Sequence, residues 1–288
     1  MARNSSEIQE IMSATASHDM MYRFLQNIFR LYPEDRFHTL LKTASRELKS
    51  DEKIYKKVQS ELPTIKPFLA DFTLSLPALK KQKQVIKAQT LQLLGSRTEL
   101  DGYVEIGSPG RYISALKSAI KLTGPVYLVN DVAPSNSPAD ILERGQIRKI
   151  GAFVPLGNYQ PISSAYIKNE SVDLVTCYIG IHHAAQDILP KFIESIRRIL
   201  RPGGLFVLRD HNAATPEMVQ FCSAIHTVFN LGTKVSWETN DQELRFFNSA
   251  DFWSNYLKAH GFKDSGARLL QDHDPSDNAL MLFTKENG

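Results

Sequence analysis

Apolar residues in the first third of the chain recur every three or four positions, which is the spacing of one face of an α-helix. The stripes occupy residues 21–32, 37–48, 65–76 and 79–94. Pro33 ends the first stripe, and Pro63 and Pro67 open the third. Such stripes need a surface to bury against. We therefore interpret residues 1–95 as a helical subdomain and, because it directly precedes a glycine-containing strand-to-helix turn, as a substrate-capping lid.

From Gly102 onward the pattern changes to short β-branched runs that alternate with helical segments. The runs predict strands at residues 103–106, 126–130, 152–156, 172–178, 204–209, 266–270 and 279–284. The segments between them predict helices at residues 110–122, 138–145, 188–200, 215–230 and 249–260. Strands that alternate with helices indicate a mostly parallel sheet, because a parallel crossover needs a connection of helix length.

The last two predicted strands are joined only by residues 271–278, which is too short for a crossover helix, so we expect them to pair antiparallel. The predicted fold class is therefore α/β. Residues 96–288 are expected to form one domain, with a seven-stranded, mostly parallel sheet, helices on both faces and an antiparallel terminal hairpin; the resemblance described below implies that this domain is Rossmann-like. The helical lid of residues 1–95 precedes it.

Composition places the chain among ordinary globular proteins: 42% of its 288 residues are hydrophobic. The two cysteines, Cys177 and Cys222, lack the spacing of metal ligands, so a reducing compartment fits better than a disulfide framework. No stretch approaches the ~18 apolar residues that span a bilayer, and the N-terminus lacks the pattern of a signal peptide. We expect a cytoplasmic protein without a membrane span.

The net charge of +3 is unevenly distributed, since residues 1–95 hold 15 Lys and Arg against 10 Asp and Glu. The densest basic run covers residues 80–83 and continues to Lys87, with no aromatic residue among the lysines. A run of this kind is usually a solvated helix face. We therefore do not expect a nucleic acid partner, although RNA binding by this helix stays an alternative.

The first predicted strand is followed by a turn that suits a nucleoside. An apolar run contains Glu105, turns on Gly107 and Gly110 and continues into a helical pattern. Glycines at such a turn let the backbone approach a ligand closely, and the following helix directs free N–H groups toward it. The next strand closes on Asp131, where a carboxylate can accept both ribose hydroxyls. Because Glu105 repels a diphosphate, the pattern favours a cationic nucleoside such as S-adenosylmethionine.

These residues carry a resemblance to a known family. Residues 102–288 resemble a class I S-adenosylmethionine-dependent methyltransferase: Glu105, Gly107 and Gly110 match its first motif, and Asp131 matches its ribose-binding acid. Two longer segments add to the resemblance. Residues 171–183 are similar to its fourth strand, and residues 198–208 are similar to its helix, Pro-Gly-Gly turn and fifth strand.

The resemblance implies S-adenosyl-L-methionine as the cofactor and extends to further residues. Ser108 of the turn and Tyr178 at the end of the fourth strand are expected beside the cofactor. Asn158 stands where the family commonly has an acid that meets the adenine amine, and its amide oxygen can accept the same hydrogen bond. The neighbouring Tyr159 could stack on the adenine ring or belong to the core.

Polar side chains gather where the fourth and fifth predicted strands end. His182 and His183 follow the fourth strand, and Asp210 and His211 follow the fifth. In an open α/β sheet both sets lie at the carboxyl edge, where ligands bind. A histidine there can act as a general base, because the pKa of imidazole is near neutral. We favour His211 because Asp210 flanks it, and we predict no metal site, since tight ligand spacing is lacking.

The function that this pattern predicts is methyl transfer from S-adenosylmethionine to an O, N or S nucleophile of a small molecule, assisted by the His/Asp cluster. Methyl transfer to RNA or protein, using the basic helix, is one alternative. A dinucleotide-dependent oxidoreductase and a non-catalytic, methyltransferase-like binding protein are two others. The sequence leaves the methyl acceptor and the oligomeric state open, as well as the role of the aromatic residues in segment 213–248.

Overall fold

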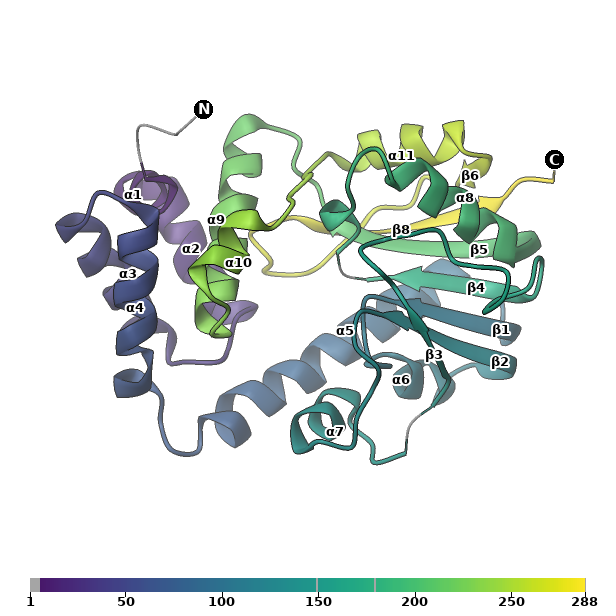
Figure 1. The fold of residues 1–288 in the computed structure, drawn as a ribbon, viewed down its shortest axis with the longest axis horizontal. Coiled ribbons are helices and arrows are strands. Elements are labelled where there is room, and N and C mark those ends of the chain that lie inside the picture. Colours follow the sequence, from purple (N-terminus) through teal and green to yellow (C-terminus); the bar gives the residue numbers. More distant parts are fainter. Residues whose placement is uncertain (1–5, 149, 179, 288) are drawn as a thin grey trace. The chain divides into compact units, whose positions relative to one another are not determined.

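The computed structural model describes residues 6–148, 150–178 and 180–287. The chain forms two compact units, a helical unit and a sheet unit (Figure 1). The helical unit comprises Met1–Lys80, His211–Phe247 and Gln271–Asp277. The sheet unit comprises Lys81–Asp210, Asn248–Leu270 and Asn278–Gly288. The division after Lys80 falls within one helix, whereas the sequence suggests a boundary at residue 95; the action of the first part as a lid stays a prediction.

The helical unit is made up of three stretches of chain, two of which share one core. Its elements are α1 (Glu7–Ser13), α2 (Thr15–Asn27), α3 (Glu34–Glu47), α4 (Asp51–Ile65), the π-helical turn η1 (Asp71–Ser75), the first turn of α5 (Leu76–Leu94), α9 (Pro216–Gly232) and α10 (Trp237–Gln242). Met21, Leu41 and Ile54 from the first stretch pack with Phe221 and Ile225 of α9. The first stretch therefore buries its apolar stripes against α9, a helix that follows it by more than a hundred residues.

One predicted helix in this unit is wrong. The third apolar stripe, residues 65–76, is not a single buried helix, because α4 ends at Ile65 and its C-cap Lys66 is extended. A residue before proline is disfavoured in the α conformation, and Pro67 follows Lys66. Phe68 and Phe72 are 100% and 69% exposed, so they contribute nothing to the core. Helix α4, by contrast, was not anticipated from the sequence, and its Tyr55 and Leu62 are fully buried.

The sheet unit contains a mixed sheet with eight strands among the described residues, one more than predicted. The strands are β1 (Glu99–Ile106), β2 (Lys121–Asn130), β3 (Ala152–Pro155), β4 (Val172–Cys177), β5 (Leu200–His211), β6 (Phe262–Asp264), β7 (Leu269–Leu270) and β8 (Asn278–Lys285). Their order is β3-β2-β1-β4-β5-β8-β6, and β7 pairs with β8. Neighbours from β3 to β5 are parallel, and β6 and β7 are antiparallel to β8.

The additional strand comes from a break in the predicted hairpin. Gly266 has φ +80°, a left-handed conformation that ends regular strand geometry. The chain therefore pairs with β8 twice, through β6 before this glycine and through β7 after it. The antiparallel terminal pairing is confirmed, and the predicted strand 266–270 is replaced by two shorter ones.

The remaining helices cover the sheet. They are α6 (Ile113–Lys117), α7 (Pro138–Arg144), α8 (Leu189–Ile199) and α11 (Ala250–Ala259), together with the sheet-unit part of α5. Ile86 of α5 and Leu116 of α6 pack with Tyr103, Leu174 and Leu205, which share one face of the sheet. Helix α6 is shorter than the predicted helix 110–122, because β2 already begins at Lys121. Parallel strands and covered faces confirm the predicted α/β class.

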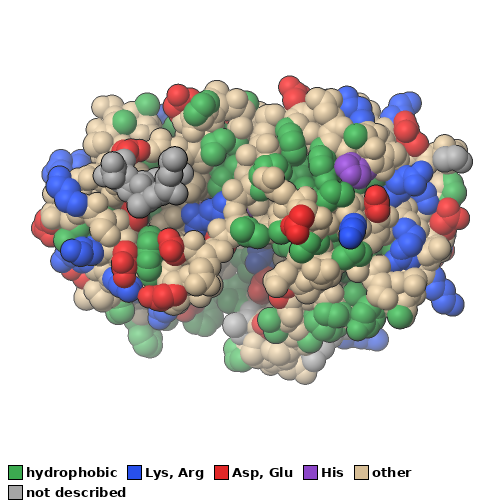
Figure 2. Space-filling model, turned by 45° about the horizontal axis from the view of Figure 1, so that its top comes forward, with side chains coloured by type: hydrophobic (Ala, Val, Ile, Leu, Met, Phe, Trp, Pro, Cys, Tyr) green, Lys and Arg blue, Asp and Glu red, His purple; other side chains and the backbone are tan. Residues whose placement is uncertain are grey.

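The side chains on the surface mix both signs of charge. On the face drawn in Figure 2, Lys and Arg side chains occur beside Asp and Glu side chains over both units. Within the described residues, each helix is too short or too polar to traverse a lipid bilayer.

Candidate active site

The turn after β1 is organised around Glu105, whose carboxylate is completely buried. Its Oε1 accepts hydrogen bonds from the Ser108 hydroxyl and, at 3.1 Å, from the Tyr112 N–H. Its Oε2 accepts from the Tyr103 hydroxyl at 3.0 Å. Burial raises the pKa of Glu105, and these three hydrogen bonds oppose that rise by favouring the charged form. Glu105 and Ser108 thus hold the turn itself, and their predicted contact with the cofactor stays a prediction.

Both glycines of the turn adopt conformations that other residues rarely reach. Gly107 has φ +78° and Gly110 has φ +91°. The Gly107 N–H donates to the Val129 carbonyl at 2.9 Å, which fastens the turn to the end of β2. A Cβ at Gly110 would lie 3.2 Å from Leu128 Cδ1. The turn therefore needs glycine for its backbone geometry, as the sequence indicates.

Two basic residues lie beside this turn and are engaged by α7. Arg111 donates through Nε to Glu143 at 3.1 Å. Lys83 of α5 donates to the Glu143 carbonyl. Burial and the nearby Arg111 guanidinium lower the pKa of Lys83 to about 8. Together these contacts tie α5, the turn and the end of α7 to one another.

Asp131 lies at the same edge of the sheet as the glycine turn. It directly follows β2, and β2 runs parallel to β1 with Ile106 opposite Val129. The side chain is exposed, and no group among the described residues bonds its carboxylate. An exposed acid at this strand end fits the two hydroxyls of a ribose.

The loop after β3 brings Asn158 to that edge. The Leu156 N–H donates to the Asn130 carbonyl at 3.0 Å, so the loop begins beside the end of β2. Asn158 is exposed and has φ +56°. The glycine turn, Asp131 and Asn158 thus lie at the ends of the neighbouring strands β1, β2 and β3. A nucleoside that binds across this edge of the sheet could contact all three.

Tyr178 directly follows β4, but its side chain is buried in the core. Its hydroxyl is 2.9 Å from the Thr90 hydroxyl of α5, and its ring packs edge-on against Tyr112 with centroids 4.7 Å apart. The side chain is fully buried in the core between the sheet and α5, and this burial raises the pKa of Tyr178. Its predicted contact with the cofactor stays a prediction.

His182 and Asp210 form a buried pair where β4 and β5 end. His182 belongs to the short helical turn η2 (Ile181–His183) that follows β4, and Asp210 is the penultimate residue of β5. The imidazole Nδ1 lies 2.9 and 3.0 Å from the two Asp210 oxygens. An ionised carboxylate only accepts hydrogen bonds, so Nδ1 carries the proton and the basic lone pair resides on Nε2.

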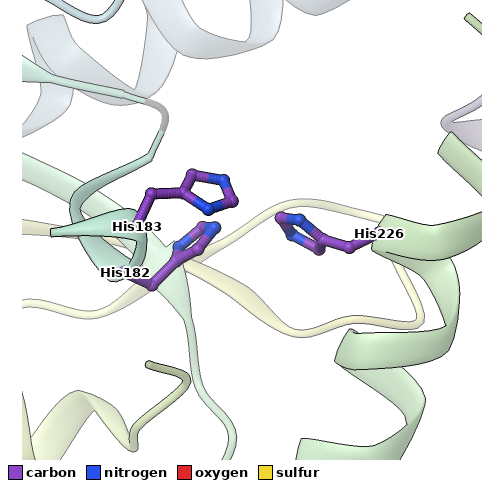
Figure 3. A group of neighbouring side chains, drawn as sticks. All are labelled: His182, His183 and His226. Atoms are coloured by element: carbon purple, nitrogen blue, oxygen red, sulfur yellow. The ribbon is translucent and has the colours of Figure 1, made fainter. Parts of the chain in front are cut away.

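The other two predicted histidines have different neighbours. The His183 ring lies beside that of His182, with centroids 4.3 Å apart (Figure 3). His211 belongs to the helical unit, where its Nδ1 is 3.2 Å from the Ser276 carbonyl and its Nε2 is 3.2 Å from Nε2 of His226 on α9. His226, which is also labelled in Figure 3, is thus a neighbour of His211. Asp210 pairs with His182, although it is His211 that follows Asp210 in the sequence.

This pairing follows from strand geometry. Successive side chains of a strand point to opposite faces, so Asp210 and His211 diverge although they are adjacent in the sequence. The partner of Asp210 comes from the loop after β4, because β4 and β5 pair in parallel with Cys177 opposite Leu208. The flanking position of Asp210 in the sequence favours His211, but strand geometry places His182 beside the carboxylate instead.

Comparisons with known proteins agree with this fold. Residues 147–208 match the family described as methyltransferase domain. That segment covers β3, β4 and most of β5, and it contains Asn158, His182 and the Pro-Gly-Gly turn. No curated protein matches the chain significantly.

Solved structures with a similar fold include three methyltransferases. One is the Burkholderia thailandensis 1,6-didemethyltoxoflavin-N1-methyltransferase, with bound 1,6-didemethyltoxoflavin and S-adenosylhomocysteine: 14% identity, TM-score 0.48, 83% of this chain and 92% of that one. A second is the CurJ carbon methyltransferase, with 15% identity and a TM-score of 0.49; the match covers 98% of this chain and 70% of that one. A third is an S-adenosylmethionine-dependent methyltransferase from Mesorhizobium loti, with 13% identity and a TM-score of 0.46; the match covers 68% of this chain and 96% of that one.

These likenesses are distant, so the substrates of those proteins do not transfer to this chain. The family match covers only residues 147–208, and the parallel strands β1 and β2 end at the glycine turn and at the exposed Asp131. Residues 147–208 are thus similar to a methyltransferase domain, within a sheet whose strands β3 to β5 are parallel.

Proposed function

We propose that this chain is a class I S-adenosylmethionine-dependent methyltransferase that transfers the methyl group of S-adenosylmethionine to an O, N or S nucleophile of a small molecule. His182 is proposed as the general base, and Asp210 as the residue that orients it. The observation that carries the proposal is the contact of Nδ1 with both carboxylate oxygens at 2.9 and 3.0 Å. The cofactor, when bound, supplies a methyl group activated by a sulfonium. The chain's own residues supply binding, orientation and proton removal.

Binding is assigned to the edge formed by the glycine turn, Asp131 and Asn158. The turn is rigid, because Glu105 and the Val129 carbonyl fix it before any ligand arrives. A preformed site loses less conformational entropy on binding. Asp131 would accept from the ribose hydroxyls, and the Asn158 amide oxygen would accept from the adenine amine.

Proton removal is assigned to His182. A hydroxyl, amine or thiol gains a methyl group and must lose a proton, and neutral imidazole is suited to accept it. With Nδ1 held by Asp210, the imidazolium that forms is stabilised by the adjacent carboxylate. Because Asp210 is fully buried, water does not compete for its oxygens.

The small-molecule assignment is supported by charge. On the face drawn in Figure 2, Lys and Arg side chains lie beside Asp and Glu side chains. The densest basic run of the sequence, residues 80–83, has no aromatic residue among its lysines, as is usual for a solvated helix face. Residues 1–95 are proposed as the substrate cap, because they directly precede the strand and the glycine turn in the sequence.

Calorimetry with S-adenosylhomocysteine tests the cofactor assignment. We expect Asp131→Ala to weaken binding about 10- to 100-fold, since a hydrogen bond to a charged group contributes about 1.5–3 kcal/mol. Glu286→Ala removes an acid of similar exposure that follows β8 and should leave the affinity unchanged. Equal affinity of wild type and Asp131→Ala would contradict the assignment.

Transfer of radiolabelled methyl groups tests the base. Pools of small hydroxyl, amine and thiol compounds are offered to the wild-type enzyme, and each accepted compound is then offered to His182→Asn. General base catalysis contributes about 10²- to 10⁴-fold, so the variant should lose at least 100-fold in rate. The control is His260→Asn, which alters a histidine at the end of α11. Full activity of His182→Asn would refute the role of the histidine.

A further inference from the structure

Tyr159 has a backbone conformation that a tyrosine rarely adopts. Gly157, Asn158 and Tyr159 follow one another with φ values of +55°, +56° and +63°. The left-handed region is unfavourable for residues with a Cβ, and it persists only where surrounding contacts enforce it. Tyr159 is the residue of this turn whose side chain is buried, at 9% exposure, so the enforcing contacts are those of its side chain.

The side chain of Tyr159 reaches the loop that follows β4. Its hydroxyl donates a hydrogen bond to the Gly180 carbonyl. Its ring packs edge-on against Phe192 of α8, with centroids 5.4 Å apart and an interplanar angle of 85°. Gly180 has φ +99°, and a Cβ there would lie 2.7 Å from the Tyr159 hydroxyl. The glycine thus provides both the conformation and the space that this contact requires.

The Gly180 carbonyl also belongs to the turn that carries the histidines. It accepts the His183 N–H at 2.9 Å, which closes the η2 turn. His182 lies between these two bonded residues, and its Nδ1 contacts Asp210. One carbonyl oxygen therefore receives both the Tyr159 hydroxyl and the amide that shapes the histidine turn.

We propose that Tyr159 is a positioning residue that links the cofactor to the general base. It sits directly after Asn158, the proposed adenine contact, and its hydroxyl holds the turn of His182, the proposed base; the inference thus rests on the proposed function. Binding of the nucleoside at Asn158 stabilises the left-handed turn, the turn holds Tyr159, and Tyr159 holds the histidine turn in its paired geometry with Asp210.

The test uses Tyr159→Phe, which removes the hydroxyl and keeps the ring against Phe192. Tyr256→Phe is the matched control, because Tyr256 lies on α11 and stacks on His260. Long-range ¹H–¹⁵N spectra of histidine-labelled protein report the tautomer and titration of His182, and amide exchange reports the His183 N–H. S-adenosylhomocysteine is the probe, added to saturation as judged by calorimetry.

In the wild type we expect the probe to shift the His182 signals and slow exchange of the His183 amide. The affinity of Tyr159→Phe for the probe should stay within threefold of the wild-type value. In the unliganded variant the exchange rate of the His183 amide should rise about five- to tenfold, which corresponds to the loss of one hydrogen bond. The response of His182 to the probe should shrink by at least half. Tyr256→Phe should behave as wild type.

Two results would overturn the inference: an unchanged His182 response in Tyr159→Phe, or a wild type that binds the probe without any response at His182. Failure of the wild type to bind the probe would instead refute the proposed function. Loss of binding in Tyr159→Phe, with an unfolding curve like that of wild type, would also overturn the inference, because the hydroxyl would then act at the cofactor itself.

Discussion

His182 and Asp210 meet through a single ring nitrogen, Nδ1, which lies 2.9 and 3.0 Å from the two carboxylate oxygens. Both side chains are almost inaccessible to water. The carboxylate therefore fixes which nitrogen carries the proton, and the orientation of the ring follows from that choice. Through this contact the buried end of β5 fixes the position of the loop after β4.

Asp210→Asn should disturb the tautomer of His182. An asparagine amide can donate to Nδ1 as well as accept from it, so the side chain no longer enforces the Nδ1–H form. Long-range ¹H–¹⁵N spectra should show the Nδ1–H tautomer in the wild type and a mixture with the Nε2–H tautomer in the variant. His260, whose Nδ1 donates to the Tyr256 carbonyl at 2.7 Å, should keep its tautomer in both proteins. An unchanged His182 signal would show that another group sets the proton position.

Glu105→Gln should weaken the glycine turn. The carboxylate accepts three hydrogen bonds, from Ser108, Tyr112 and Tyr103, and a glutamine places an NH₂ group against some of these donors. A buried group left unsatisfied costs about 1–3 kcal/mol. We expect the free energy of unfolding, measured with urea, to fall by about 2 kcal/mol, and the affinity for S-adenosylhomocysteine to fall with it.

The matched control for this change is Glu99→Gln at the start of the same strand. Glu99 is exposed and pairs with the exposed Lys121 at 2.8 Å. Exposed ion pairs contribute about 0–1 kcal/mol, so its loss should shift the unfolding curve little. Equal effects of the two substitutions would show that burial of Glu105 is not what makes it important.

The alternation of strands with helices and the glycine turn could be predicted from the sequence, because both depend on local patterns. Short apolar runs separated by helix-length segments leave few alternatives to a parallel sheet. Glycines at 107 and 110 show φ values of +78° and +91°, as a tight turn requires. Asp131 was placed correctly at the sheet edge for the same reason, since it ends a strand.

Tertiary contacts decide what could not be predicted. The stripe at residues 65–76 has the spacing of a buried helix, yet Phe68 and Phe72 face solvent because no surface covers them. Asp210 has a histidine beside it in the sequence and another beside it in space, and only the register of β4 and β5 distinguishes the two. No local sequence pattern indicates the left-handed conformation of Tyr159. That conformation is maintained by a hydrogen bond to Gly180, a residue 21 positions away.

Acid should remove one contribution to the stability of the sheet unit. Burial alone would raise the pKa of Asp264, but hydrogen bonds from Arg268, Ser254 and the Gly266 N–H outweigh it and lower this pKa to about 2. A carboxyl group with a lowered pKa stabilises the fold above its unfolded value of about 4, and the contribution is lost as the pH falls toward 2. The site is partly exposed, so solvent screening reduces the contribution to about 1 kcal/mol.

Urea unfolding of Asp264→Asn at two pH values measures this contribution. At pH 7 the variant should be less stable than wild type by about 1 kcal/mol, and at pH 2 the two proteins should differ little. A stability difference that is the same at both pH values would mean that Asp264 acts through its shape and hydrogen bonds and not through its charge.

Gly232→Ala should destabilise the helical unit, because α9 and α2–α3 meet there with no room for a methyl group. A Cβ at this position would lie 2.3 Å from Cζ of Phe29, a buried ring that also packs on Tyr32 and Phe37. Overpacking of a dense core costs about 1–3 kcal/mol. The chain has two tryptophans, and Trp237 belongs to the helical unit while Trp253 belongs to the sheet unit. In a Trp253→Phe background, fluorescence follows the helical unit alone, and Gly232→Ala should lower its urea midpoint.

Gly203→Ala, where a Cβ would meet nothing within 4 Å but φ is +70°, provides the comparison. That change introduces backbone strain of about 1–2 kcal/mol in the sheet unit, so in a Trp237→Phe background it should be detected by Trp253. A Gly232→Ala variant with the wild-type midpoint would show that Phe29 can move aside at no cost, and the core shared by α9 and the N-terminal helices would then be looser than its packing indicates.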